Sequence, residues 1–332
     1  MSRQKRYYPE MDALKGFAIF LVILSHAIIV FPINLHKNAV CNWILNFISS
    51  VHMPLFFCIS GFFFSCPQNY SDYLRKKWKR IAAPYLVFNL LDMLLRSTLS
   101  FLFHRPRNVM ESLLSILFHG GEFWFLYVLF FIYALFPPLA ALQKKRMRWK
   151  ITVETAFLFC AASPIGDFWL FNLGNLRTYL FFFNTGFLLR NLYPLIYERV
   201  KEASRLKIAV LSSMLLALWI TLLSSPLHTQ YKYVVSVSLA LIGIATIYPL
   251  VFWKTFHNAF VRFGPWTLQL YLLNGWTLGI SRSIICNIMG VRNPAVIIVF
   301  NMLVDFGLSY VVIKYFLARF RVARYVMGVT ES

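Results

Sequence analysis

The stretch LKGFAIFLVILSHAIIVFPI, residues 14–33, decides the fold class. A helix needs about 20 predominantly apolar residues to cross the hydrocarbon core of a bilayer, and this stretch supplies them. Similar apolar runs recur to the end of the chain. The sequence therefore predicts an all-α, polytopic integral membrane protein with about ten transmembrane helices. The expected spans are residues 14–33, 43–66, 81–103, 123–141, 151–170, 178–196, 208–225, 232–252, 266–288 and 295–316.

The overall composition supports the same class. Of the 332 residues, 59% are hydrophobic and only 14% are charged, and the mean hydropathy is +0.63. Soluble domains average about 45–50% apolar and about 25% charged residues. These values exclude a disordered chain, a coiled coil and a secreted disulfide scaffold. No stretch between the apolar runs is long enough for a separate soluble core, so a single membrane-embedded domain is expected over residues 1–332.

The distribution of lysine and arginine predicts the orientation in the membrane. Most of the 33 basic residues lie in the two terminal segments and in alternate connections. Cytoplasmic loops are enriched in Lys and Arg, so both termini are expected in the cytoplasm. Topology then accounts for most of the net charge of +21, which points to membrane lipids and not to nucleic acid as the partner. The connections expected outside hold Lys37, Arg105, Arg107, Arg177, Lys232 and Arg292.

Lys15 and His26 are the most informative polar residues of the first span, because ionisable groups at membrane depth are costly and mark functional sites. Eleven residues turn a helix through about 1100°, which leaves the two side chains on one face, about 16 Å apart along the axis. Asp12, three residues before Lys15, can pair with it. A neutral imidazole in a polar cavity can act as a general base. The alternative is a buried histidine that ties helices together by hydrogen bonds.

A second polar segment, His52-Met53-Pro54, lies within the next span and is followed by Ser60-Gly61. Proline inside a span frees a backbone carbonyl and kinks the helix. His52 is then expected either to line the same cavity as His26 or to serve packing alone.

The basic run Arg75-Lys76-Lys77-Trp78-Lys79-Arg80 precedes the third span. Such a cluster at the membrane face can bind anions, phosphates above all. The alternative is a cytoplasmic loop that contacts anionic lipid headgroups.

Other polar residues at depth are expected to be structural. Asp92 and Arg96 are four residues apart and can neutralise each other, Asp305 can pair with Arg282, and Trp124 can anchor at the interface beside Glu122. The segment 112–123 is expected to form a short amphipathic or re-entrant piece. The five cysteines show no CxxC pair and no metal-ligand spacing, so no metal is expected. Walker, GxSxG and HExxH motifs are absent from the sequence, which gives no support to ATP-driven transport or serine hydrolysis.

Taken in order, these segments resemble the membrane-bound acyltransferase family 3, which includes O-acetyltransferases of bacterial surface polysaccharides. The resemblance covers the whole chain. The first three motifs at their spacing are specific, whereas each motif alone is weak. The matching residues are Lys15-x10-His26, His52-Met53-Pro54-Leu55-Phe56-Phe57 through Ser60-Gly61-Phe62, Lys76-Lys77-Trp78-Lys79-Arg80-Ile81 with Pro84-Tyr85, Trp124-Phe125-Leu126, and Phe183-Asn184-Thr185-Gly186-Phe187.

Two positions depart from the family pattern. The basic residue of the first span is often arginine but here is Lys15, which keeps the charge and loses the bidentate geometry. A late histidine of the family is replaced by Asn274, which cannot act as an acid or base, so no role of that histidine is carried over. Relatives with an appended hydrolase-like domain extend further, whereas this sequence ends soon after the last span. This chain is therefore expected to transfer the acyl group itself.

The resemblance implies an O-acyltransferase of the bacterial cytoplasmic (inner) membrane that moves acetyl from cytoplasmic acetyl-CoA to a sugar hydroxyl of a cell-surface or lipid-linked glycan. His26 and Lys15 would be catalytic. Other residues would bind the donor or the acceptor. The donor nucleotide would dock on Lys76, Lys77 and Arg80, and the acceptor would meet His52, Ser60, Glu122 and Trp124.

Two other functions remain open. A transporter or flippase of lipid-linked saccharide would also need a polar cavity at mid-membrane, but not a CoA-specific basic site. A non-catalytic membrane sensor or partner subunit is the third possibility. The enzyme is expected to bind CoA and the flippase is not, so a measurement of CoA binding distinguishes the two.

Overall fold

The computed structural model describes residues 7–29, 35–98, 108–164, 170–317 and 319–328. Within these ranges the chain consists of helices and connections without a strand, which confirms the predicted all-α class. Some sequence expectations fall outside the described residues. They are the ends of the spans expected at residues 14–33, 81–103 and 151–170, and the basic residues Arg3, Lys5, Arg6, Arg105 and Arg107.

The helical elements follow one another along the whole chain. In sequence order they are α1 (Pro9–Ile29), η1 (Leu35–Lys37), α2 (Ala39–Ser49), α3 (His52–Phe62), α4 (Tyr70–Lys77), η2 (Trp78–Ala82), α5 (Ala83–Thr98), α6 (Val109–Phe118), η3 (Gly121–Phe123), α7 (Trp124–Lys145), α8 (Met147–Ala162), η4 (Leu170–Asn172), α9 (Leu173–Glu202), α10 (Arg205–Ser224), α11 (Leu227–Gln230), α12 (Lys232–Ile247), η5 (Tyr248–Phe252), α13 (Lys254–Phe260), η6 (Val261–Trp266), α14 (Thr267–Arg282), η7 (Ser283–Ile288), α15 (Pro294–Val311), η8 (Val312–Leu317) and α16 (Arg321–Val326).

A helix lies at each of the expected spans, and the chain is a multi-pass membrane protein. Among the described residues, 6 helical stretches are both long and apolar enough to cross a membrane. The count of about ten spans stays a prediction that rests on the apolar runs. The 6 stretches are Pro9–Ile29, Ala39–Phe62, Val109–Lys145, Arg205–Ser224, Lys232–Phe252 and Pro294–Tyr315.

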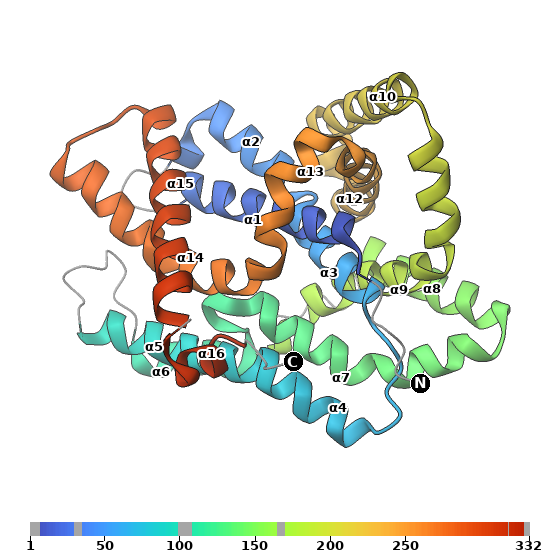
Figure 1. Ribbon diagram of the computed structural model, residues 1–332, viewed down its shortest axis with the longest axis horizontal. Helices are drawn as coiled ribbons and strands as arrows, with labels where there is room; N and C mark the ends of the chain where they lie inside the picture. The colour runs from blue at the N-terminus through green and yellow to red at the C-terminus, as the bar shows by residue number, and fades with distance from the viewer. Residues whose placement is uncertain (1–6, 30–34, 99–107, 165–169, 318, 329–332) are drawn as a thin grey trace.

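Helix α1 forms the centre of the bundle. It packs against α3, α13, α14 and α15, with α10 and α12 to one side of it and α15 to the other (Figure 1). Gly16 permits the closest of these approaches, because a Cβ there would collide with the carbonyl oxygen of Phe260 at the end of α13. By contrast, only 22% of the apolar stretch of α10 is buried within the protein, as expected for a helix that faces lipid.

The second expected span differs from the prediction of one kinked helix. It is divided at Ser50 and Val51 into α2 and α3, and His52 is the first residue of α3. Pro54 therefore stands in the first turn of a new helix, where its missing N–H costs no helical hydrogen bond. The break places His52 and Met53 at the start of a helix deep in the bundle, where both are buried.

Helices α3 and α9 form the most extensive helix pair, and two glycines make it possible. A Cβ at Gly61 would collide with the carbonyl oxygen of Phe183, and a Cβ at Gly186 would collide with that of Cys58. Small residues in this arrangement let two membrane helices approach at backbone distance. Close helix packing therefore explains why the motif Phe183–Phe187 contains a glycine.

The basic run is helical and not a loop, which corrects the sequence expectation. It continues from α4 through the π-helical turn η2 into α5. Lys77 and Arg80 are three residues apart and share a face; Lys77 is half-buried there, whereas Arg80, like Lys76 and Lys79, is exposed. The helical geometry therefore places Lys77 and Arg80, of the five cations in the run, on one face.

The segment 112–123 is an amphipathic helix followed by a tight turn. Helix α6 leaves Leu114 and Leu117 exposed and buries Ile116. Gly120 (φ 90°) and Gly121 (φ 55°) adopt the left-handed backbone that this turn requires. Asn89 on α5 then accepts the backbone N–H of Glu122 at 3.1 Å, which fixes the start of α7.

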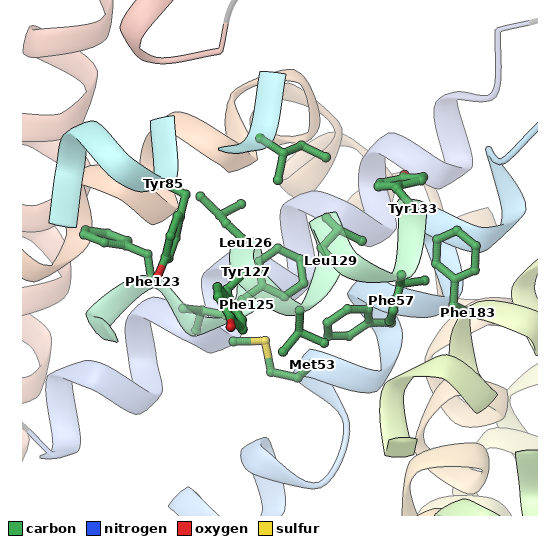
Figure 2. Packing of buried hydrophobic residues seen from close by; sticks show 14 of the residues in the cluster. Met53, Phe57, Tyr85, Phe123, Phe125, Leu126, Tyr127, Leu129, Tyr133 and Phe183 are labelled. Atoms are coloured by element: carbon green, nitrogen blue, oxygen red, sulfur yellow. The ribbon is translucent and has the colours of Figure 1, made fainter. Parts of the chain in front are cut away.

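The largest hydrophobic core is rich in aromatic rings and lies where α3, α7 and α9 meet. Phe57 of α3 stacks on Tyr179 of α9 with ring centres 4.3 Å apart, and it meets Phe125 of α7 edge-on at 5.0 Å. Figure 2 shows Met53 and Phe57 facing Phe125 and the neighbouring residues of α7. This core holds in place the helices that form the wall of a cavity.

Candidate active site

A cavity of about 930 Å³ lies between α1, α3, the basic helix α4–η2, α7, α9 and α14. Its size falls within the range of small-molecule and cofactor sites, about 300–1,000 Å³. Figure 2 labels part of its wall, namely Met53, Phe125, Leu126, Leu129 and Tyr133. The other lining residues are Tyr8, Lys15, Phe56, Ile59, Ser60, Phe63, Ser65, Lys77, Arg80, Ile81, Arg190, Thr267, Leu268 and Tyr271.

Four cationic side chains line this cavity: Lys15, Lys77, Arg80 and Arg190. Their elements are far apart in the sequence, and the fold brings them to one space. None of the lining residues is an aspartate or glutamate. Asp12 forms the expected ion pair with Lys15 at 3.0 Å, so the cavity has an excess of positive charge. Such a surface favours an anionic ligand with several phosphate groups.

The ammonium group of Lys77 lies over an aromatic ring. Its Nζ is 3.4 Å from the centre of the Tyr133 ring, a cation–π contact. The Tyr133 hydroxyl in turn donates to the backbone oxygen of Ser60 at 3.4 Å. Burial, with a smaller effect of the Arg80 charge, lowers the pKa of Lys77 from 10.5 to about 7. An incoming anion would restore the charged form of this lysine.

Arg190 is the cation that sequence reasoning did not assign to the site. It stands on α9, and its Nη1 donates to the backbone oxygen of Phe64 at 3.0 Å. In the sequence, Arg190 only contributes to the cytoplasmic excess of basic residues. Its one distinguishing signal is its position shortly after Asn184-Thr185 of the family motif, about one and a half helical turns away.

A buried polar network fixes α9 against α7 and α8. Gln143 of α7 donates to Asn184 of α9 at 2.7 Å, and Asn184 donates to Glu154 of α8. The Thr185 hydroxyl also donates to Glu154, at 2.6 Å. The partly buried carboxylate of Glu154 is satisfied by these donors, and the network holds the helix that carries Arg190.

The cavity wall also contains apolar side chains. They belong to Phe56 and Ile59 of α3 and to Leu126 and Leu129 of α7, and Ser60 adds a hydroxyl. A ligand with a charged head and a long, largely neutral arm fits this combination. The cavity thus joins four of the residues predicted from the sequence, namely Lys15, Ser60, Lys77 and Arg80.

His26 of α1 and His52 of α3 form a second group. His26 lies further along α1 than Lys15, toward the middle of the membrane. Neither histidine lines the cavity, but α1 and α3, which carry them, pack against each other and bring the two imidazoles close enough for electrostatic interaction. The Nδ1 of His52 donates to the backbone oxygen of Ile48 at 2.8 Å. In the neutral ring this leaves Nε2 as the acceptor atom. Met53, next to His52, lines the cavity and links the two groups in space.

Lys76, Glu122 and Trp124 do not line the cavity. Lys76 and Glu122 are exposed, and Lys76 points away because it lies about 100° around the helix from Lys77. The Trp124 ring stacks on Tyr179 at 5.6 Å and so belongs to the aromatic core. The expected pair of Arg282 and Asp305 is not among the ion pairs of the described residues: Arg282 donates to the backbone oxygen of Ala27, and the Asp305 carboxylate accepts from the Thr277 hydroxyl.

A family model described as an acyltransferase domain, acyltransferase family 3, matches residues 8–314. No curated protein and no solved structure matches the chain.

Proposed function

The chain belongs to acyltransferase family 3 and carries an acyltransferase domain, and we propose that it transfers acetyl from acetyl-CoA to a sugar hydroxyl of a cell-surface or lipid-linked glycan. The observation that carries this proposal is the cavity whose wall contains both four cations and a set of apolar side chains. CoA has a matching combination: phosphates at one end and a long neutral arm that ends in the thioester.

The donor would bind with its phosphates on Lys77, Arg80 and Arg190, each of which lines the cavity. Its arm would pass along the apolar side chains toward His26, on the face of α1 that begins with Lys15. The distance along α1 between these residues is about 16 Å, which suits an extended arm. Lys15 would neutralise charge at the entrance of this path, while Asp12 fixes its side chain.

The transfer needs one general base, and this base ends the reaction in the protonation state in which it began. His26 would take the proton of the sugar hydroxyl as its oxygen attacks the thioester carbonyl carbon. The tetrahedral intermediate would collapse to the acetyl ester with cleavage of the carbon–sulfur bond. The proton would then pass from His26 to the leaving thiolate, which gives CoA-SH. A ternary complex of this kind is preferred over an acyl-histidine intermediate.

His52 supports this step from the second helix of the site. Its Nδ1 is held by Ile48, so that its Nε2 can orient His26 or the acceptor. Ser60 is proposed to contact the acceptor in the cavity, and Glu122 and Trp124 to contact the sugar outside it. The proposed setting is the inner membrane of a bacterium, with acetyl-CoA in the cytoplasm and the acceptor entering from the opposite side.

The experiment follows radiolabelled acetyl from acetyl-CoA to glycan in membranes that contain the chain. Base-labile label on glycan, absent from membranes without the chain, is the expected result. CoA binding to the purified protein is measured beside it. A saccharide flippase is the alternative, and it predicts transport of a lipid-linked saccharide with neither CoA binding nor labelled glycan. That outcome would overturn the proposal.

A further inference from the structure

A polar seam lies between α14 and α15, away from the cavity. On α15 it consists of Asn301, Asp305 and Ser309, which recur every four residues and are all fully buried. On α14 it consists of Asn274, Thr277 and Ser281, also buried. Helix α15 is apolar elsewhere, and an apolar helix that buries one polar stripe against its neighbour marks a site, because polar groups at membrane depth are costly.

Two hydrogen bonds fix the register of the two helices. The Thr277 hydroxyl donates to Oδ1 of Asp305, and the Ser281 hydroxyl donates to Oδ1 of Asn301 at 2.7 Å. A step of four residues forward on α14 thus matches a step of four residues back on α15. The same antiparallel register, extended by one turn, brings Asn274 toward Ser309.

Three buried oxygen atoms of this seam have no hydrogen-bond partner among the described residues. They are Oδ1 of Asn274, Oδ2 of Asp305 and Oγ of Ser309. Buried polar atoms in proteins are nearly always paired, so three orphaned oxygens at neighbouring positions indicate a ligand that accepts their lone pairs. Oδ1 of Asp305 and the Thr277 hydroxyl lie beside them.

Asp305 also lacks a counter-charge within the part of the chain that the structure describes. The ion pairs among those residues join Lys15 to Asp12 and Arg96 to Asp92. Asp305 lies eleven residues, or about 16 Å, beyond the start of α15, which is close to the middle of a hydrocarbon core about 30 Å thick. A carboxyl group there is stable only if it binds a proton or if a positive charge from another source balances it.

From this geometry we infer that Asp305, Thr277, Ser309 and Asn274 form a binding site for one monovalent alkali cation. Carboxylate, hydroxyl and amide oxygens are the ligands that hard cations prefer. One carboxylate balances one positive charge, whereas a divalent ion would leave a net charge in the membrane. Bound there, the cation would fix α15 on α14 beside α1. This site is independent of acyl transfer.

The test uses the full chain in nanodiscs of zwitterionic lipid, which bind few cations themselves. The melting temperature is measured as NaCl replaces choline chloride at constant ionic strength, with KCl and LiCl in parallel. A saturable rise with at least one alkali chloride is expected, because a ligand that binds only the folded state raises the melting temperature. Melting temperatures that are equal in all chlorides would overturn the inference. Melting temperatures that change with pH but not with the cation would also overturn it.

The decisive variant is Asp305→Asn, which keeps the shape and removes the charge. It should lose the cation-dependent rise, whereas the matched control Asp92→Asn, on another membrane helix, should keep it. Persistence of the rise in Asp305→Asn would contradict the site. If that variant does not fold, Ser309→Ala is expected to weaken the cation dependence several-fold. Binding of the alkali ion that gives the largest rise, measured on the wild-type protein at equilibrium, is expected at one ion per chain, and no binding of that ion would likewise overturn the inference.

Discussion

The ammonium nitrogen of Lys77 lies 3.4 Å from the centre of the Tyr133 ring, inside a cavity that also contains Arg80. The contact joins the basic helix after the second span to α7, since Tyr133 lies 56 residues after Lys77 in the chain. It holds a lysine in a partly buried position, where it can meet an anion but has little water around it. Donor binding should therefore depend on Lys77 more than on its exposed neighbours.

Removal of this charge is expected to weaken donor binding. Lys77→Met should raise the apparent KM for acetyl-CoA about 10- to 100-fold, because a hydrogen bond to a charged group contributes about 1.5–3 kcal/mol. The matched control is Lys76→Met, which changes an exposed lysine one position away. Steady-state kinetics in nanodiscs give the two constants. An equal KM in both variants would return the basic helix to a role in topology or lipid contact.

Donor binding should also depend on pH through Lys77. Its pKa in the free protein is lowered to about 7, so the ammonium form is present below pH 7 and is lost above it. Phosphates stabilise the charged form, so the pKa is higher in the complex. The dissociation constant of CoA should therefore rise between pH 7 and the pKa of the complex.

The control for this pH dependence is Lys77→Arg, because arginine stays charged over the whole range. Isothermal titration at several pH values compares it with the wild type. Titration of the CoA phosphates affects both proteins equally. An identical pH dependence in both would show that another group controls binding.

The contact between α3 and α9 should not tolerate a larger residue. Gly61→Ala places a methyl group against the backbone of Phe183 and should cost about 1–3 kcal/mol, as overpacking does in cores. Gly279→Ala is the control, because no atom lies within 4 Å of an added Cβ there. Thermal melting in detergent measures both. A melting temperature of Gly61→Ala equal to that of the wild type would contradict this close helix contact.

The sequence predicts helix positions well because apolar runs of span length have few other structural solutions in a membrane. It does not predict the break at Ser50 and Val51. Residues on both sides of that break are equally apolar, and Pro54 is compatible with a kink or with a helix start. The sequence also does not show that the basic run is helical, since its charges are typical of a cytoplasmic loop.

Part of the candidate site follows from the sequence in the same way. Lys15 and Lys77 stand in recognisable motifs at fixed spacing. Arg190 and Tyr133 do not, because they reach the cavity only through the packing of α9 and α7. Apart from its position shortly after Asn184-Thr185, nothing in the sequence distinguishes Arg190 from the other cytoplasmic cations. The pair His26–His52 was predicted as part of one cavity with Lys15, but the two imidazoles lie beyond its lining residues.

The most direct test of the account is acetyl transfer by His26→Ala compared with the wild type and with His36→Ala, an exposed histidine outside the site. Both variants are first checked for membrane insertion and CoA binding. The account predicts that His26→Ala binds CoA with unchanged affinity and loses at least about 100-fold in transfer rate, the contribution of a general base, while His36→Ala keeps its activity. Transfer by His26→Ala at the wild-type rate would contradict the proposed mechanism.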